Sequence, residues 1–272
     1  MCAAGHTSRT MYETDFPQEL TDRVAALIHG AERVVVFTGA GISTDSGIPD
    51  FRGPKGLWTE NPEAEKTSNI HYYLNDPEVR KAAWKNRVRN WDRKLEPNGG
   101  HHAVTALHGT GKLHAVITQN VDGLHQAAGT PNELVWELHG TVMSAHCWEC
   151  KDRQPMAELI KRVMAGEEDP RCRLCGGIMK SDTILFGESL VPEVLDGAMS
   201  AAGSCDVLLA VGSTLGVSPA NNAVPRARAA GAHVVIVNGG PTEMDNYAHV
   251  LVNGSITAAM EAIVAAVKRM GT

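Results

Sequence analysis

The chain has 272 residues, of which 43% are apolar and 21% are charged, and its formal net charge is -6. This length suffices for one large core, or for a main domain with a smaller companion. The negative charge gives no general attraction for nucleic acid or for an acidic membrane surface. The N-terminus shows no apolar segment of signal-peptide length and no run approaches the roughly 20 residues of a membrane span, so we expect a cytoplasmic protein without membrane contact.

Four apolar runs are typical of buried parallel strands, at residues 33–41, 114–122, 206–214 and 233–240. Helical segments are predicted around them, at residues 17–31, 101–109, 219–230 and 257–270. Strands that alternate with helices indicate an α/β fold with a doubly wound, Rossmann-like parallel sheet. Ligands of such sheets bind beyond the carboxyl ends of the strands, so we expect the polar residues after each run to form the site.

The first run leads into Gly39-Ala40-Gly41, a glycine turn that would let the backbone approach a pyrophosphate closely. As a dinucleotide fingerprint the turn is incomplete, because Thr44 stands at the third glycine position. Several Gly and Pro residues between positions 47 and 56 disfavour a long regular helix after the turn. We interpret the turn as a nucleotide site, and the alternative is a tight turn without a ligand.

Two segments interrupt the alternation, at residues 53–100 and 143–185. We predict that both are insertions, the first helical and the second metal-binding, which together build a smaller lobe. The main domain would then comprise residues 1–52, 101–142 and 186–272.

Polar side chains follow the second run, in the sequence TQNVDGLH at residues 118–125. Gln119, Asn120 and Asp122 would suit a carboxamide or a ribose hydroxyl, which need directional hydrogen bonds. Taken alone, these residues are better explained as an Asx-type turn in which Gly123 supplies the positive φ. Further along, the sequence ELHGT contains His139, which would be a general base if it lay beside a nucleotide, although a lone histidine is more often structural.

Four of the six cysteines form two CxxC pairs. This spacing is typical of a closed tetrahedral zinc site with a structural role, and a rubredoxin-like iron site is the alternative. A nucleic-acid-binding ribbon is disfavoured, because the residues between the pairs mix acidic and basic side chains and give no basic face. The predicted metal ligands are Cys147, Cys150, Cys172 and Cys175.

Together these motifs resemble the sirtuin family of NAD-dependent protein deacylases. The resemblance runs over about residues 33–256 and rests on GAGISTDSGIPDFRG, TQNVDGLH, LHG, the two CxxC pairs, FGE (186–188), GSTLGVSPA (212–220) and VN (237–238). In sirtuins the segment after the glycine turn is a mobile loop that closes over NAD, which would explain the absence of a rigid helix. The stretches RGPKGLWT and NGGPTEMD are similar to the branch that includes chromatin-associated vertebrate sirtuins.

The resemblance implies a role for each matching residue. His139 would be the general base, and Asn120 and Asp122 would form the catalytic nicotinamide pocket. The further implied NAD contacts are Gly39, Ala40, Gly41, Asp50, Phe51, Arg52, Trp58, Gln119, Gly212, Ser213, Thr214, Asn238 and Ile256. The implied contacts to the substrate peptide are Phe186, Gly187, Glu188, Gly216 and Val217. The usual Gly-Thr-Ser order is Gly-Ser-Thr here, which exchanges one hydroxyl for another.

The implied reaction removes an acyl group from protein lysines, uses NAD as co-substrate, and releases nicotinamide and O-acyl-ADP-ribose. The alternative is mono-ADP-ribosyl transfer to protein in the same site. One Zn per chain would be structural, and acylated-lysine proteins would be the partners, with no direct binding of nucleic acid. Sirtuins that remove succinyl or malonyl groups carry a Tyr-x-x-Arg pair, whose positions align with Arg87 and Asn90 here, so we expect a preference for acetyl.

Overall fold

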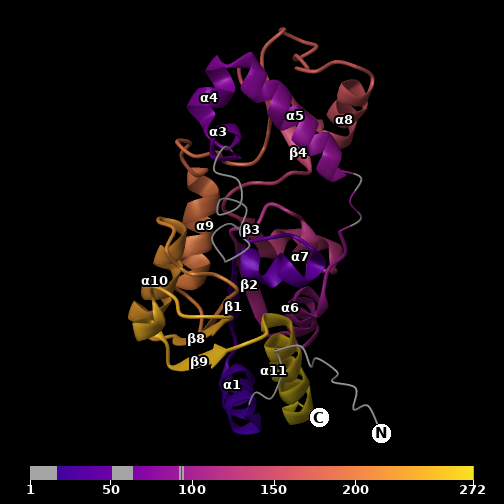
Figure 1. The fold of residues 1–272 in the computed structure, drawn as a ribbon. Coiled ribbons are helices and arrows are strands. Elements are labelled where there is room, and N and C mark those ends of the chain that lie inside the picture. Colours follow the sequence, from indigo (N-terminus) through magenta and orange to yellow (C-terminus); the bar gives the residue numbers. More distant parts are fainter. Residues whose placement is uncertain (1–16, 51–63, 92, 94, 272) are drawn as a thin grey trace, which may run out of the picture.

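The computed structural model describes residues 17–50, 64–91, 93 and 95–271. Figure 1 shows a central sheet between two layers of helices, and a second group of elements at the end of the molecule far from the C-terminus. No helix among the described residues is long and apolar enough to cross a membrane.

Six parallel strands form the main sheet, in the order β3-β2-β1-β7-β8-β9. They are β1 (Val34–Thr38), β2 (Leu113–Thr118), β3 (Val135–Glu137), β7 (Val207–Val211), β8 (His233–Asn238) and β9 (Val250–Asn253). The strand order runs outward from β1 on one side and from β7 on the other, as in a doubly wound Rossmann sheet. The predicted α/β fold is therefore confirmed, with a carboxyl-end crevice between β1 and β7.

All four predicted strands are present, and the structure adds β3 and β9 at the two edges. The three residues of β3 are only half-buried, and β9 alternates between buried and exposed positions. Edge strands such as these lack the continuous apolar run that identifies a central strand of a parallel sheet.

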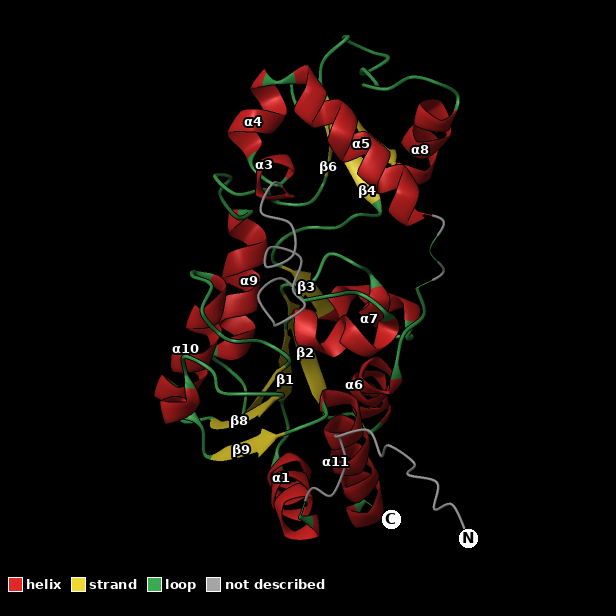
Figure 2. Ribbon diagram, viewed as in Figure 1, coloured by secondary structure: helices red, strands yellow, loops and turns green. Residues whose placement is uncertain are grey.

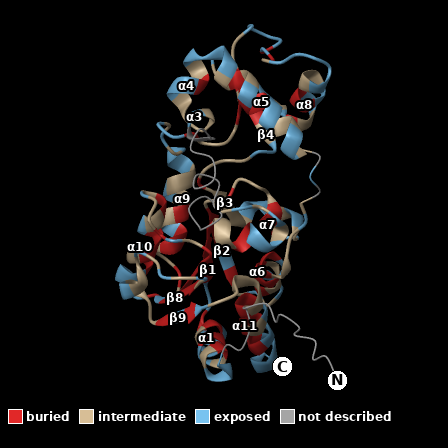
Figure 3. Cartoon of the chain, viewed as in Figure 1, coloured by how far each residue is buried: buried red, intermediate tan, exposed pale blue. Residues whose placement is uncertain are grey.

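Successive side chains of β1 point to opposite faces of the sheet and enter two separate cores. Val34 and Val36 pack with α1 (Gln18–Gly30), α6 (Gly99–Gly109) and α11 (Ile256–Met270). Val35 and Phe37 pack with α9 (Pro192–Ala202) and α10 (Ala223–Ala229) on the other face. Figure 2 shows these helices on either side of the strands, and Figure 3 shows that their buried positions face the sheet.

Shorter elements complete the main part of the chain. They are η1 (Ala40–Ser46), α7 (Leu124–Ala127), η2 (Asn132–Leu134), η3 (Ala220–Asn222) and η4 (Asp245–Tyr247). The glycine turn thus opens a short 3-10 helix, which ends at Gly47 with a φ of 84°. This ending agrees with the expectation that no long helix follows the turn.

The smaller lobe combines elements of both predicted insertions. The first supplies α3 (Ala64–Thr67), α4 (Ile70–Asn75) and α5 (Pro77–Trp91). The second supplies α8 (Met156–Met164) and an antiparallel sheet of β4 (Ser144–Cys147), β5 (Arg153–Pro155) and β6 (Met179–Ser181), in the order β5-β4-β6. Trp84 of α5 shares a buried cluster with Leu159 and Ile160 of α8, so the two insertions have a common core.

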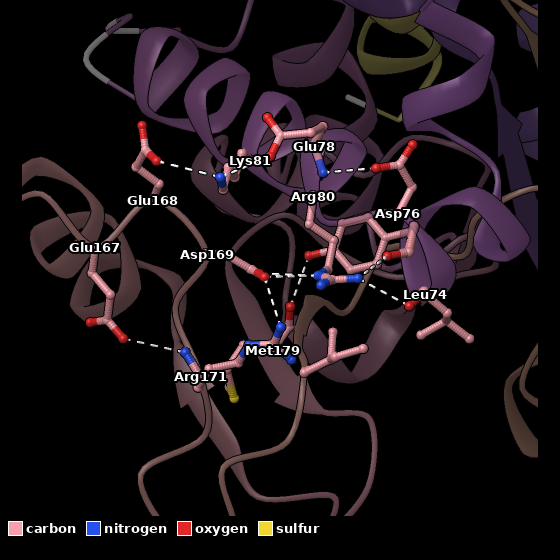
Figure 4. A network of polar contacts seen from close by, with 12 residues as sticks. Leu74, Asp76, Glu78, Arg80, Lys81, Glu167, Glu168, Asp169, Arg171 and Met179 are labelled. Carbon is pink, nitrogen blue, oxygen red and sulfur yellow. Dashed lines mark hydrogen bonds and ion pairs between the residues drawn. The ribbon is translucent and has the colours of Figure 1, made fainter.

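A buried ion pair joins the same two insertions (Figure 4). The Arg80 side chain is 3% exposed, and its Nε lies 3.1 Å and 3.0 Å from the two carboxylate oxygens of Asp169. Its Nη1 donates to the carbonyl oxygens of Tyr73 and Leu74 at the end of α4. Arg171 contacts Asp169 from the other side at 3.0 Å. Because a buried charge is stable only when it is paired and hydrogen-bonded, these contacts fix the two insertions against each other.

Candidate active site

A cavity of about 890 Å³ lies at the carboxyl ends of the central strands, where the strand order reverses. Most of the residues predicted to act on NAD line it, together with Val217 of the predicted peptide contacts. These are Ala40, Gly41, Asp50, Gln119, Asn120, His139, Gly212, Ser213, Thr214, Val217, Asn238 and Ile256. Phe51, Arg52 and Trp58 lie outside the described residues.

The glycines that follow β1 and β7 pack backbone against backbone. A Cβ atom on Gly41 would lie 2.8 Å from the Cα and the carbonyl oxygen of Gly212, and one on Gly39 would lie 2.7 Å from the Cβ of Ser213. Gly212 has a φ of 65°, and its carbonyl accepts the Gly41 amide at 2.8 Å. Side chains are therefore excluded where the two loops meet, which leaves main-chain groups at the floor of the cavity.

Asn120 holds the glycine turn from the side of β2. Its Nδ2 donates to the Gly39 carbonyl and to Ser43 Oγ, each at 3.1 Å. Ser43 in turn donates to Asp122 at 2.8 Å. Both amide hydrogens of Asn120 are thereby used, and its Oδ1 is left to accept a hydrogen bond in the cavity that Asn120 lines. Asp122 does not line the cavity but is linked to Asn120 through Ser43, which the sequence did not single out.

The orientation of His139 is set by Gln119. His139 Nδ1 lies 2.9 Å from the Gln119 carbonyl oxygen, which can only accept, so Nδ1 carries the hydrogen and Nε2 carries the lone pair. Burial lowers the pKa of His139 from its usual value, although the hydrogen bond to Gln119 acts in the opposite direction. The imidazole is thus neutral near pH 7 and offers a basic nitrogen. Gln119 also accepts from Ser213 Oγ at 2.9 Å through its side chain.

The far end of the cavity contains residues that sequence reasoning missed. Besides Asn238 and Ile256, the lining includes Thr44, Asp45, Gly239, Gly240, Pro241, Gly254 and Ser255. Asn238 Nδ2 donates to the Gly240 carbonyl at 2.8 Å, which orients the amide. The run of small residues after β8 could have indicated this end of the cavity. The residues after β9 gave no such indication, because that strand was not predicted.

The residues predicted to contact a peptide are only partly gathered at the cavity. Val217 lines it, and Gly216 packs against the Glu243 side chain beside it. Phe186 is 45% exposed, and its main chain pairs with the segment around Asn69. Glu188 points into the smaller lobe, where its carboxylate lies 2.9 Å from the buried Lys180 Nζ. The Glu188 side chain therefore has a structural partner of its own.

The four cysteines of the CxxC pairs meet at one end of β4. Their sulfur atoms all lie within 4.8 Å of one another. Each pair forms the same turn: the Lys151 amide donates to the Cys147 carbonyl, and the Gly176 amide donates to the Cys172 carbonyl. Lys151 and Gly176 both have positive φ, which closes the two turns alike. Four converging thiols suit a tetrahedral zinc ion with no open position.

Comparison with known proteins agrees with this geometry. The sequence model of the Sir2 family matches residues 39–219. The chain is 45% identical over 234 residues to NAD-dependent protein deacetylase 2 of Streptomyces coelicolor, which covers 86% of this chain and 97% of that protein. It is 41% identical over 240 residues to NAD-dependent protein deacetylase 1 of Pyrobaculum aerophilum, with coverage of 88% and 92%.

Two solved structures are similar over almost the whole chain. One, from work on the mechanism and regulation of Sir2 enzymes, gives a TM-score of 0.84 at 37% identity and covers 93% of this chain and 99% of the other. Another, a Sir2 protein with a deacetylated peptide and 3'-O-acetyl ADP ribose, gives 0.80 at 30% identity with coverage of 92% and 98%. On the sequence match and the shared architecture, the chain belongs to the Sir2 family.

Proposed function

We propose that this chain is an NAD-dependent protein-lysine deacylase, which releases nicotinamide and O-acyl-ADP-ribose and acts chiefly on acetyl groups. The observation that carries the proposal is the basic Nε2 of His139, held by Gln119 at the edge of a cavity with a glycine-loop floor. The relatives named as deacetylases, and the neighbour solved with a deacetylated peptide, support it.

When bound, NAD supplies the ribose carbon that accepts the acyl oxygen and the nicotinamide that leaves. The main-chain groups of Gly39, Gly41 and Gly212 would bind the pyrophosphate, since no side chain intervenes there. Asn120 Oδ1 would accept the carboxamide N–H of the nicotinamide. Asn238 and Ile256 would bind the adenosine end.

His139 would remove the proton from a ribose hydroxyl once nicotinamide has left. The pKa lowered by burial keeps Nε2 unprotonated near neutral pH, as a base requires. The Nδ1 hydrogen bond to the Gln119 carbonyl would stabilise the positive charge that the ring gains. A general base of this kind typically contributes about a hundredfold to ten-thousandfold in rate.

Other parts of the chain would serve this site indirectly. We propose that the four cysteines hold one structural Zn, and that the substrate peptide lies between residues 186–188 and 216–217. In this proposal residues 1–52, 101–142 and 186–272 bind NAD, and the helical and zinc-binding insertions shape the peptide side. Acylated-lysine proteins would be the partners.

The test is nicotinamide release from a panel of acyl-lysine peptides with NAD, followed by mass spectrometry of the products. Loss of acyl mass from the peptide together with O-acyl-ADP-ribose supports the proposal. A gain of ADP-ribose mass on protein, without loss of the acyl group, would favour the transferase alternative. Failure to release nicotinamide with every peptide would refute both.

A further inference from the structure

Two buried histidines lie beneath the cavity without touching it. His101 of α6 and His125 of α7 are 0% and 1% exposed, and their rings meet edge to face with centroids 5.1 Å apart. Neither lines the cavity, so neither is a direct ligand contact. Both are hydrogen-bonded to residues that position Asn120.

One arm of this arrangement runs from His125 to the main chain of Asn120. His125 Nε2 lies 2.9 Å from Thr38 Oγ1, Thr38 donates to Thr118 Oγ1 at 2.9 Å, and Thr118 Oγ1 accepts the Asn120 amide at 3.1 Å. Thr38 and Thr118 are register partners at the last positions of β1 and β2. The single hydroxyl hydrogen of Thr38 is used on Thr118, so Thr38 must accept from His125 Nε2–H.

The second arm holds the side chain of Asn120. His101 Nε2 lies 3.4 Å from Ser43 Oγ, and Ser43 accepts from Asn120 Nδ2 while donating to Asp122. His101 Nδ1 accepts the Asn98 amide at 3.4 Å, so this ring also carries its hydrogen on Nε2. Burial lowers the pKa of His101 to about 4 and that of His125 to about 3, which keeps both rings neutral. Every hydrogen bond of the two arms then has one direction.

The first arm fixes the main chain of Asn120, while the Gly39 carbonyl and Ser43 Oγ decide which atom of its side chain faces the cavity. Reversal of the amide would place Oδ1 against the Gly39 carbonyl, which is also an acceptor. We infer that His125 is a positioning residue for nicotinamide: through Thr38 and Thr118 it holds the main chain of Asn120 in the place from which Asn120 Oδ1 accepts from the ligand. The inference rests on the proposed function, because it concerns the nicotinamide end of NAD.

The consequence is a selective effect on one end of the ligand. ADP-ribose lacks nicotinamide, so its affinity reports on the glycine loops and the adenosine end alone. The affinity for NAD also includes the contact to Asn120. Loss of the chain of hydrogen bonds should therefore weaken NAD binding relative to ADP-ribose binding, whereas general loosening of the fold should weaken both.

The experiment measures dissociation constants for NAD and ADP-ribose by calorimetry in the full chain and in its variants. Thr38→Val keeps shape and removes the hydroxyl, His125→Leu removes the donor, and His125→Gln retains a donor near Nε2. Thr105→Val is the matched control. It removes a hydroxyl whose hydrogen bond of 2.8 Å, to Thr130, is not part of either arm.

We expect Thr38→Val and His125→Leu to raise the ratio of the two dissociation constants, NAD over ADP-ribose, about tenfold. ADP-ribose affinity should stay within about twofold, His125→Gln should recover part of the ratio, and Thr105→Val should not change it. If His125→Leu does not fold, Thr38→Val and His125→Gln still decide. An unchanged ratio in Thr38→Val, or an equal loss for both ligands, would overturn the inference. A wild-type chain that binds neither ligand would overturn the proposed function and this inference with it.

Discussion

Acidification from pH 7 to pH 5 should destabilise the folded chain steeply, because two histidines are buried in the neutral form. The pKa of His101 is lowered to about 4 and that of His125 to about 3, in both cases mainly by burial. In the unfolded chain both would titrate near 6.5. Between these values the unfolded chain binds protons that the folded chain does not, so stability is lost as pH falls below about 6.5.

The magnitude follows from the size of the pKa shifts. Each histidine should remove roughly 2 kcal/mol of unfolding free energy between pH 7 and pH 5, so the pair should remove about 4 kcal/mol. His139 acts in the same direction, since burial lowers its pKa as well. Glu137 acts in the opposite direction, because burial raises its pKa and the folded chain takes up a proton there as pH falls.

The assay is urea unfolding followed by circular dichroism at pH 7, 6 and 5, with extrapolation to water. His101→Asn and His125→Gln should each reduce the pH 7 to pH 5 difference by about 2 kcal/mol. His102→Asn is the matched control, because this neighbouring histidine is exposed. The reasoning is wrong if His101→Asn and His125→Gln show the same difference between pH 7 and pH 5 as the wild type.

Four further changes test other parts of the molecule. His139→Ala should lower turnover at least about a hundredfold with NAD affinity nearly unchanged by calorimetry, and retention of more than about a tenth of turnover would exclude it as the base. Removal of Zn with a chelator should unfold the smaller lobe, because Cys147 and Cys172 are part of its buried cluster. Full activity in protein that contains less than half an equivalent of Zn by metal analysis would contradict this. Acetyl-lysine should exceed succinyl-lysine in kcat/KM on one peptide, because Arg87 and Asn90 stand where the Tyr-x-x-Arg pair would bind a carboxylate. A succinyl value equal to or above the acetyl value would contradict this. Arg80→Met should cost about 3 kcal/mol in urea unfolding, whereas Lys81→Met, which changes a partly exposed side chain, should cost little. Equal effects would show that the buried pair does not stabilise the lobe.

The central part of the fold was predictable because its signals are local. Residues 34–37 and 207–211 are continuous apolar runs between helical segments, which is the pattern of a strand covered on both faces. The order of the strands in the sheet could not be predicted from local sequence patterns, because it depends on pairing between distant segments. The short, half-buried β3 lacked any such signal.

The same distinction holds for the site. The glycine turn, His139 and the cysteine pairs can each be identified from a short sequence motif. Asp45 cannot be identified in this way. It lines the cavity and accepts a hydrogen bond of 2.6 Å from the hydroxyl of Thr257, which is 212 positions away in the sequence. The ion pair of Glu188 with Lys180 could not be predicted either, because the sequence does not show that this lysine is buried.

The contact between the two glycine loops affects how tolerance to substitution at these positions should be interpreted. Gly39, Gly41 and Gly212 exclude a Cβ because their backbones touch each other, whether or not a nucleotide is bound. A library selected only for folded protein, in a chain already inactivated at His139, should therefore still reject alanine at Gly41 and Gly212. Intolerance to substitution at these glycines therefore reports on how the two loops pack together. We expect it in any related protein that keeps the fold, including one that has lost its catalytic activity.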